Sequence, residues 1–141
     1  MDAVTPGNDG PYNPNLGVLD NILKLLQRHL YVSPESYVAI ALWILLSHAS
    51  DYFHYRSRLA ISSPARGCGK TTVLRLIDLV ARDTLFASNI SSAALYRLVA
   101  AQQPTLLIDE ADSFLGGNDQ LRGIINAGFE RNGKIIRCVG D

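Results

Sequence analysis

The sequence predicts an α/β domain built around a mostly parallel sheet, and three observations indicate this class. Short apolar stretches, expected as strands near residues 58–62, 84–87 and 105–109, alternate with longer stretches whose apolar residues recur at helical spacing. A glycine-containing segment follows the first expected strand, and two adjacent carboxylates follow the third. Such alternation is typical of parallel strands joined by crossover helices, with polar groups gathered at the carboxyl ends of the strands.

The stretch before this alternation predicts a tail and two helices. Residues 1–15 are rich in Pro, Gly, Asn and Asp, which is typical of a disordered tail. Apolar residues at helical spacing predict a first helix over 16–30. Ser33 offers an N-cap and Pro34 a first-turn residue for a second helix, which we expect to end near Ala49. This second helix is apolar nearly all round, so we expect it to be buried.

The remaining elements complete the expected core. Helices are predicted at 70–82, 91–102 and 119–131, and a last short strand at 134–139. Ser91 and Asn118 offer N-caps for the last two of these helices. The chain is therefore expected to hold three parts: a tail at 1–15, a two-helix cap at 16–56 and an α/β core at 57–141.

Composition and charge limit the classes of function. The chain has 141 residues, 48% of them hydrophobic, which suffices for one domain with a core. Its 13 basic and 13 acidic side chains cancel, so no overall field draws in nucleic acid or a membrane surface, although a local patch still could. The longest apolar run, at 38–46, is too short to span a bilayer. Cys68 and Cys138 form no disulfide or metal pattern and no secretory signal is evident, so we expect a cytoplasmic protein without membrane contact.

The most informative segment is Ser63-Pro64-Ala65-Arg66-Gly67-Cys68-Gly69-Lys70-Thr71. A strand, a glycine-containing loop ending in Gly-Lys-Thr and a helix are the layout of a phosphate-binding P-loop. The glycines let backbone N–H groups curve around a phosphate, and the helix N-terminus adds its positive dipole end. Lys70 would contact the β- and γ-phosphates of a nucleoside triphosphate, and the Thr71 hydroxyl would hold Mg²⁺. The residues expected at the nucleotide are Pro64, Ala65, Arg66, Gly67, Cys68, Gly69, Lys70, Thr71 and Thr72.

Pro64 departs from the general motif, which has glycine at that position. Proline can turn the chain off a strand, but it has no N–H group to donate to a phosphate.

A second motif, Thr105-Leu106-Leu107-Ile108-Asp109-Glu110-Ala111-Asp112, is typical of a Walker B element because an apolar strand ends in adjacent carboxylates. Asp109 would hold the hydration shell of Mg²⁺ opposite Thr71. Glu110 would activate the attacking water as a general base, so Lys70 and Glu110 are the expected catalytic residues. The alternative is a strand that leaves the core into a polar turn. Asp112 is expected in that turn or as an outer neighbour of the metal.

Four polar residues have both a functional and a structural interpretation. Arg66 could contact the γ-phosphate or face solvent, and Asn89 could face the nucleotide or cap the following helix. Arg122 or Arg131 could act as an arginine finger toward a neighbouring subunit. Alternatively, Arg122 is a surface residue and Arg131 complements a helix dipole.

Ring side chains also allow two interpretations. An aromatic group between the cap and the first strand could stack on adenine or pack in the core; these residues are Tyr52, Phe53 and Tyr55. The histidines lack the spacing of a helical metal pair and are expected to be structural; they are His29, His48 and His54.

With both motifs present, the sequence resembles P-loop ATPases of the AAA+ or helicase-like type. Several segments resemble a narrower group, an uncharacterised ATPase domain of phage, plasmid and actinobacterial proteins that often accompanies primase-like modules. These segments are Leu42-Trp43, Ile61-Ser62-Ser63-Pro64, Gly67-Cys68-Gly69-Lys70-Thr71, Ser88-Asn89-Ile90-Ser91, residues 104–112 and Leu121-Arg122-Gly123-Ile124. In that group proline follows serine at the loop entrance, as Pro64 does here.

The resemblance implies a three-layer αβα P-loop fold, ATP and Mg²⁺ as cofactors, a homo-oligomer, and hydrolysis coupled to remodelling of DNA, another nucleic acid or replication proteins. It also implies a sensor strand and an arginine-bearing segment beyond residue 141, so we expect a sheet incomplete at the C-terminus and a fragment that binds nucleotide better than it hydrolyses it. Two alternatives stay open. One is a nucleotide-gated assembly module without turnover, and the other, ranked lower, is a small-molecule kinase.

Overall fold

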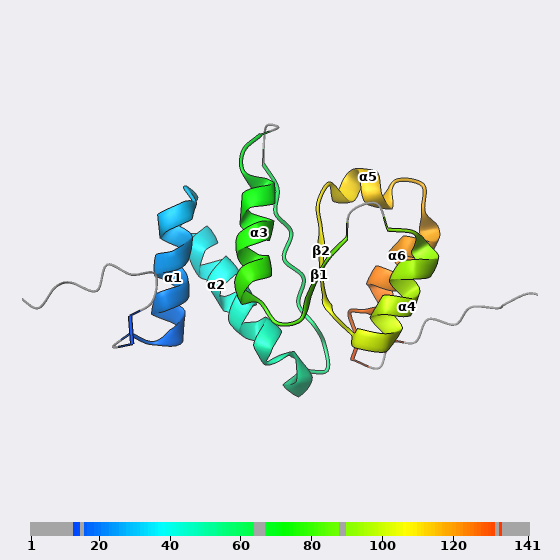
Figure 1. Cartoon of the computed structure of the whole chain (residues 1–141), viewed down its shortest axis with the longest axis horizontal. Helices are drawn as coiled ribbons and strands as arrows, with labels where there is room; N and C mark the ends of the chain where they lie inside the picture. Colours follow the sequence, from blue (N-terminus) through cyan, green and yellow to red (C-terminus); the bar gives the residue numbers. More distant parts are fainter. Residues whose placement is uncertain (1–12, 15, 64–66, 88–89, 132, 134–141) are drawn as a thin grey trace, which may run out of the picture. The chain divides into compact units, whose positions relative to one another are not determined.

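The computed structural model describes residues 13–14, 16–63, 67–87, 90–131 and 133. Its elements in chain order are α1 (Val18–His29), α2 (Pro34–His48), the 3-10 helix η1 (Ser50–Tyr52), α3 (Lys70–Val80), β1 (Thr84–Ala87), α4 (Ser92–Gln102), β2 (Thr105–Ile108), α5 (Ala111–Leu115) and α6 (Asp119–Ala127) (Figure 1). The mixed α/β class is therefore confirmed. The chain divides into two compact units, Met1–Leu42 (unit 1) and Trp43–Asp141 (unit 2), and the boundary falls inside α2.

In unit 1, the buried Asn21 fixes the start of α1. Its Oδ1 accepts a hydrogen bond of 2.7 Å from the backbone N–H of Asn13. Its Nδ2 group donates to the carbonyl oxygens of Asn13, Leu16 and Gly17. Because no side chain caps α1 at Gly17, these bonds take over the role of ordering the helix entrance.

Helix α2 is buried along one face only. Ile40, Ala41 and Ile44 are buried, whereas Val38 and Leu42 are 46% and 50% exposed. The prediction of a helix buried all round is therefore wrong, because other residues pack against just one of its faces.

The sheet of unit 2 is a parallel pair of strands. Thr84 of β1 lies opposite Thr105 of β2, and Ala87 lies opposite Ile108. Helix α4 connects the strands, so β1, α4 and β2 form a β–α–β unit, as the alternation predicted. The carboxyl ends of both strands therefore lie at one edge of the sheet.

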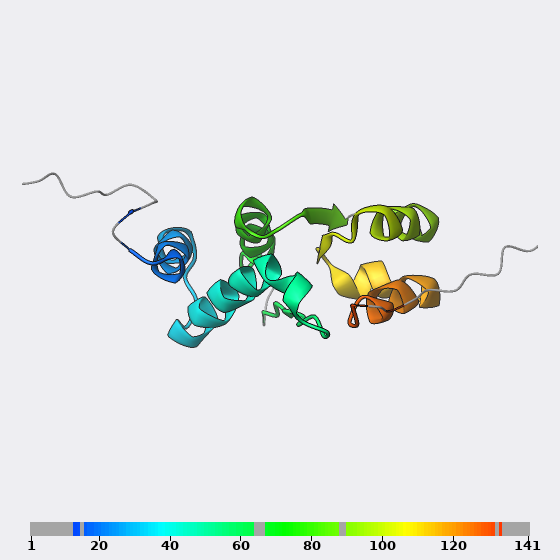
Figure 2. The same ribbon diagram turned by 90° about the horizontal axis from the view of Figure 1, so that it is seen from below.

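Helices lie on both sides of this sheet, with α3 on one side and α4 and α6 on the other (Figures 1 and 2). Helix α3 buries Val73, Leu76 and Ile77. On the other side, Leu95 of α4 packs with two buried residues of α6, Leu121 and Ile124. The two helices are capped as predicted: the Ser91 side chain accepts from Ala94 N–H, and the Asn118 side chain accepts from Leu121 N–H.

The predicted strand at 58–62 is absent: the described residues 56–63 contain no strand. Just before this stretch, Tyr55 and Glu130 form an isolated antiparallel bridge. The Arg56 N–H donates to Phe129 O at 2.9 Å, and the carbonyl of Ser57 accepts from the indole of Trp43 at 3.2 Å. The backbone at the entrance to this stretch is thus committed to partners outside the sheet. The predicted strand at 134–139 and the predicted tail lie outside the described residues, except for residues 13 and 14 of the tail.

Two helices end earlier than predicted, and a backbone N–H group within four residues of each end binds a partner far along the chain. Helix α3 ends at Val80, and the N–H of Arg82 donates to Ser47 Oγ at 3.1 Å. Helix α6 ends at Ala127, and the N–H of Arg131 donates to His54 O at 2.9 Å. The short helix α5 follows Glu110 directly and was not predicted.

Candidate functional site

The glycine-containing loop turns into α3 through two left-handed glycines. Gly67 has φ of +78° and Gly69 has φ of +82°. Gly69 is the N-cap of α3, and its carbonyl accepts the first helical hydrogen bond, from Val73 N–H at 3.1 Å. A Cβ atom added at either glycine would meet no heavy atom within 4 Å among the described residues. Backbone conformation, rather than crowding, therefore requires glycine here.

Lys70, the first residue of α3, reaches back across the loop. Its Nζ donates to Ser63 Oγ at 2.9 Å, and the lysine is partly buried. The bond joins the residue before the loop to the residue after it. The ammonium group is thus held beside Ser63, and a phosphate bound at the start of α3 would need a positive charge nearby.

Thr71 and Asp109 bring the two sequence motifs together. Thr71 Oγ1 donates to Asp109 Oδ2 at 2.8 Å, although the two residues are 38 positions apart in the chain. The other carboxylate oxygen, Asp109 Oδ1, accepts from the backbone N–H of Glu110 at 3.0 Å. Asp109 follows β2 directly, so its carboxylate lies at the carboxyl end of the parallel pair, where open α/β sheets bind ligands.

Glu110 occupies a strained backbone position beside this carboxylate. Its φ and ψ are both +51°, in the left-handed region that non-glycine residues seldom adopt. It precedes α5, its carbonyl accepts from Phe114 N–H at 3.0 Å, and the residue is exposed. Left-handed conformation at a non-glycine residue costs about 1 kcal/mol and often marks a functional position.

The other predicted site residues have the following places. Cys68 and Thr72 are exposed beside Gly69 and Thr71. Arg122 pairs at 3.7 Å with Asp119 on the exposed face of α6, and Arg131 is exposed. The predictions for Pro64, Ala65, Arg66 and Asn89 fall outside the described residues, as does the side chain of Asp112.

The described residues fit magnesium and a triphosphate. Mg²⁺ takes oxygen ligands, and in nucleotide sites it uses one or two protein oxygens together with phosphates and water. Thr71 and Asp109 supply a hydroxyl and a carboxylate in contact with each other, and Lys70 adds a positive charge nearby in the chain. In the part of the chain that the structure describes, no group of three or more His, Cys, Asp or Glu side chains could hold a metal ion.

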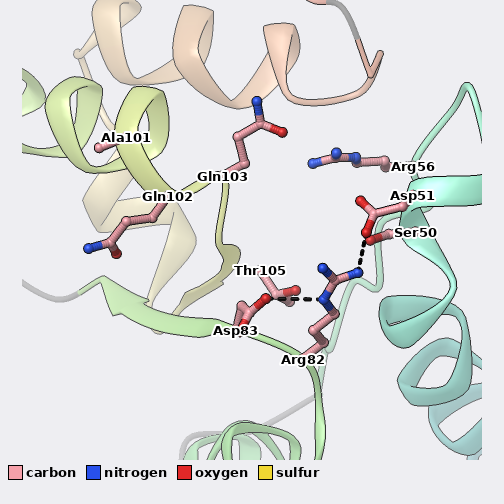
Figure 3. Close-up of a pocket in the computed structure, with 9 residues that line it drawn as sticks. All are labelled: Ser50, Asp51, Arg56, Arg82, Asp83, Ala101, Gln102, Gln103 and Thr105. Carbon is pink, nitrogen blue, oxygen red and sulfur yellow. Dashed lines mark hydrogen bonds and ion pairs between the residues drawn. The ribbon is translucent and has the colours of Figure 1, made fainter.

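A polar pocket of about 230 Å³ lies at the opposite, amino end of the two strands (Figure 3). Asp83 precedes β1 and Thr105 begins β2, and both line this pocket. Arg82 lies between two carboxylates, in contact with Asp51 and at 3.1 Å from Asp83. The Nε atom of Arg56 is buried without a hydrogen-bond partner among the described residues. No sequence motif pointed to this cluster, which only the fold assembles.

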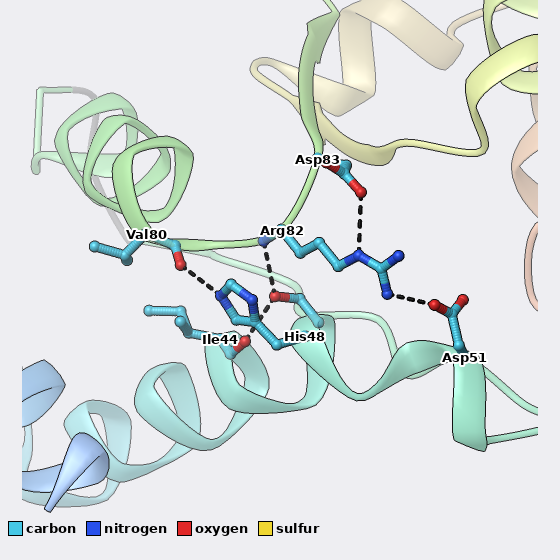
Figure 4. A network of polar contacts seen from close by, with 7 residues as sticks. Ile44, His48, Asp51, Val80, Arg82 and Asp83 are labelled. Carbon is cyan, nitrogen blue, oxygen red and sulfur yellow. Dashed lines mark hydrogen bonds and ion pairs between the residues drawn. The ribbon is translucent and has the colours of Figure 1, made fainter.

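The Arg82 cluster fixes the connection between α3 and β1 (Figure 4). Ser47 Oγ donates to Ile44 O at 2.6 Å and accepts from Arg82 N–H, and His48 Nε2 lies 2.8 Å from Val80 O. The hydrogen bond and charge of Arg82 hold the pKa of Asp51 below its ordinary value, with smaller effects from Arg131 and Arg56. The same contacts raise the pKa of Arg82. We interpret the cluster as structural, and His48 contacts the backbone of Val80 within it.

No protein-family model, curated protein or solved structure matches this chain. In the described part of the chain, each helix is too short or too polar to cross a bilayer.

Proposed function

We propose that this chain binds ATP together with Mg²⁺ at the site formed by the glycine loop, Lys70, Thr71 and Asp109. The observation that carries the proposal is the 2.8 Å hydrogen bond between Thr71 Oγ1 and Asp109 Oδ2. It joins the two residues that separate sequence motifs nominate as metal ligands. If the strand merely ended in a polar turn, we would not expect that turn to contact the first turn of α3.

Each residue has a role that follows from its chemistry. The Lys70 ammonium would bind the β- and γ-phosphates, and the N–H groups at the start of α3 would face the same anion. Thr71 and Asp109 would hold the metal, which neutralises phosphate charge when bound. The Glu110 carboxylate, exposed beside Asp109, would accept a proton from the attacking water. A three-layer P-loop fold is part of this proposal, supported by helices on both sides of the parallel pair.

The proposal extends to coupling. We propose that hydrolysis drives remodelling of nucleic acid or of a replication complex, in a cytoplasmic homo-oligomer, on the strength of the sequence resemblance. A nucleotide-gated assembly module without turnover is the second candidate. It is favoured by the Thr71–Asp109 bond, which links α3 to the end of β2, so that binding of nucleotide and metal there would act on both elements without turnover. A small-molecule kinase ranks third, because adjacent carboxylates after β2 favour activation of water.

Thermal unfolding with and without Mg-ATP tests binding. At about a hundred times its Kd, ATP should add about 2.7 kcal/mol to the free energy of unfolding. Lys70→Ala should abolish this gain, whereas Lys24→Ala, an exposed lysine on α1, should retain it. A cooperatively folded wild type that gains no stability from Mg-ATP would contradict the proposal.

Phosphate release separates turnover from gating. Glu110→Gln should keep nucleotide binding and lose hydrolysis, since the amide cannot accept the proton. Glu130→Gln, a second exposed glutamate, is the matched control and should change neither. Binding without any phosphate release in the wild type would favour the gated module.

A further inference from the structure

A surface of unit 2 outside the nucleotide site gathers aromatic rings and arginines. We call it the ring–arginine patch; its members are His54, Tyr55, Arg56, Arg58, Phe129 and Arg131. Two backbone hydrogen bonds join the two segments: Arg56 N–H to Phe129 O and Arg131 N–H to His54 O, both at 2.9 Å. They flank the antiparallel bridge between Tyr55 and Glu130. The patch is therefore assembled on paired backbone, and not on a single loop.

The rings of the patch contact one another at tilted and edge-on angles and are open to solvent. The centroids of Tyr55 and Phe129 are 5.4 Å apart with an interplanar angle of 32°, and His54 meets Tyr55 edge-on at 4.8 Å. Tyr55 is 57% exposed and Phe129 is 42% exposed. Large apolar rings left in water at this level are available to stack on a planar partner.

Arg58 and Asn126 build a pocket beside these rings. The pocket is a shallow hollow, largely open to solvent, and is lined by Arg58, Asn126 and Phe129. The Arg58 guanidinium lies 5.5 Å above the Phe129 ring and donates to Ile125 O at 2.9 Å and to Asn126 Oδ1 at 3.4 Å. A ring face, a fixed guanidinium and a side-chain amide are the groups that bind a base by stacking, a phosphate by charge and a base edge by hydrogen bonding.

The local charge suits a polyanion even though the whole chain is neutral. Two exposed arginines of the patch, Arg58 and Arg131, accompany one carboxylate, that of Glu130, whereas the Arg56 side chain lines the polar pocket beside Asp51. The nearby Asp51 is already paired with Arg82. This local excess of positive charge attracts phosphates. The net charge of the whole chain does not reveal it, because acidic residues elsewhere balance it.

We propose that the ring–arginine patch binds single-stranded nucleic acid, with one base in the pocket lined by Arg58, Asn126 and Phe129. A duplex fits less well because its bases are already stacked and cannot cover Tyr55 or Phe129. An apolar protein partner fits less well because it would have to desolvate the Arg58 guanidinium, which lies over the Phe129 ring. The inference adds a binding surface for a partner to the proposed function. Only the link between this surface and ATP hydrolysis rests on the proposed function.

Fluorescence anisotropy of the whole chain with a labelled oligothymidylate of about twelve nucleotides tests the proposal in the absence of ATP. Phe129→Leu, which removes the ring but keeps apolar volume, should weaken binding about fivefold or more, whereas Phe129→Tyr should bind like the wild type. Arg58→Ala should weaken binding and lower the slope of log affinity against log salt by about 0.7. Tyr52→Ala and Arg75→Ala remove an exposed ring and an exposed arginine outside the patch, and both should bind like the wild type.

Three further arms decide the outcome. An oligouridylate and an oligodeoxyuridylate of equal length should also bind, and the ratio of their affinities shows which sugar is preferred because both carry the same base. A duplex of the same length should bind more weakly than the single strand. The proposal is overturned by an absence of binding in the folded wild type, by equal affinity of Phe129→Leu, or by a preference for duplex. Lys70→Ala should leave strand binding unchanged, so failure here and failure of ATP binding are distinguishable.

Discussion

The Thr71 hydroxyl donates to the Asp109 carboxylate across 2.8 Å, from the first turn of α3 to the carboxyl end of β2. At the proposed site, the Thr71 oxygen would face Mg²⁺ and the Asp109 carboxylate would face its water shell. A hydroxyl that donates its hydrogen keeps its lone pairs for a metal. The bond would therefore orient both oxygens in advance without having to be broken.

A double-mutant cycle measures this bond directly. Thr71→Val, Asp109→Asn and the double variant should give a coupling free energy of about 1 kcal/mol in urea unfolding. The Thr72→Val and Asp109→Asn pair is the control, because Thr72 is adjacent and exposed but belongs to no such bond in the described structure. Equal coupling in both cycles would mean that the contact contributes nothing specific.

Glu110→Gly should stabilise the protein while ending hydrolysis. The residue has φ of +51°, and glycine removes a left-handed penalty of about 1 kcal/mol. Glu110→Ala should not stabilise, since alanine pays the same backbone cost. Urea unfolding of both variants and phosphate release by Glu110→Gly check this. Stabilisation by alanine equal to that by glycine would assign the effect to the lost carboxylate.

Gly69→Ala and Gly123→Ala should have opposite signs. An added Cβ meets no described atom within 4 Å at either position, so crowding is equal. Gly69 has φ of +82°, and alanine there should lose about 1 kcal/mol of stability. Gly123 lies inside α6, where alanine should gain about 0.5–1 kcal/mol. Thermal unfolding of the two variants separates backbone conformation from packing, and equal signs would contradict the interpretation of the loop.

Asp51→Asn should reduce the loss of stability in acid. Arg82 holds the pKa of Asp51 below the ordinary value of 3.8, so the folded carboxylate stays ionised where the unfolded one takes up a proton. The protein therefore takes up a proton when it unfolds in this pH range. The stability that the pair contributes is lost as the pH falls below the unfolded pKa of Asp51 and through its lowered folded pKa. Urea titrations from about pH 5 to about pH 2 should show a shallower decline for Asp51→Asn and for Arg82→Gln than for the wild type. An unchanged decline would show that the pair is fully screened by solvent.

Local sequence patterns were sufficient to predict the features whose conformation depends on nearby residues. The positions of β1 and β2, the caps Ser91 and Asn118, and the glycines before α3 were all predictable, because propensity, capping and φ depend on neighbours a few residues away. The pairing of Thr71 with Asp109 was predictable at the level of roles, since both motifs point to a metal. Whether they bind one stays a prediction.

The sequence by itself determined the positions of most helices and of the two parallel strands, and it nominated the residues that we propose for phosphate binding. The tertiary structure decided that the backbone of residues 54–56 pairs with residues 129–131 and that the Phe129 ring contacts Tyr55. It also decided that Arg82 lies between Asp51 and Asp83. These outcomes depend on competition between hydrogen-bond partners far apart in the chain, which no local pattern records.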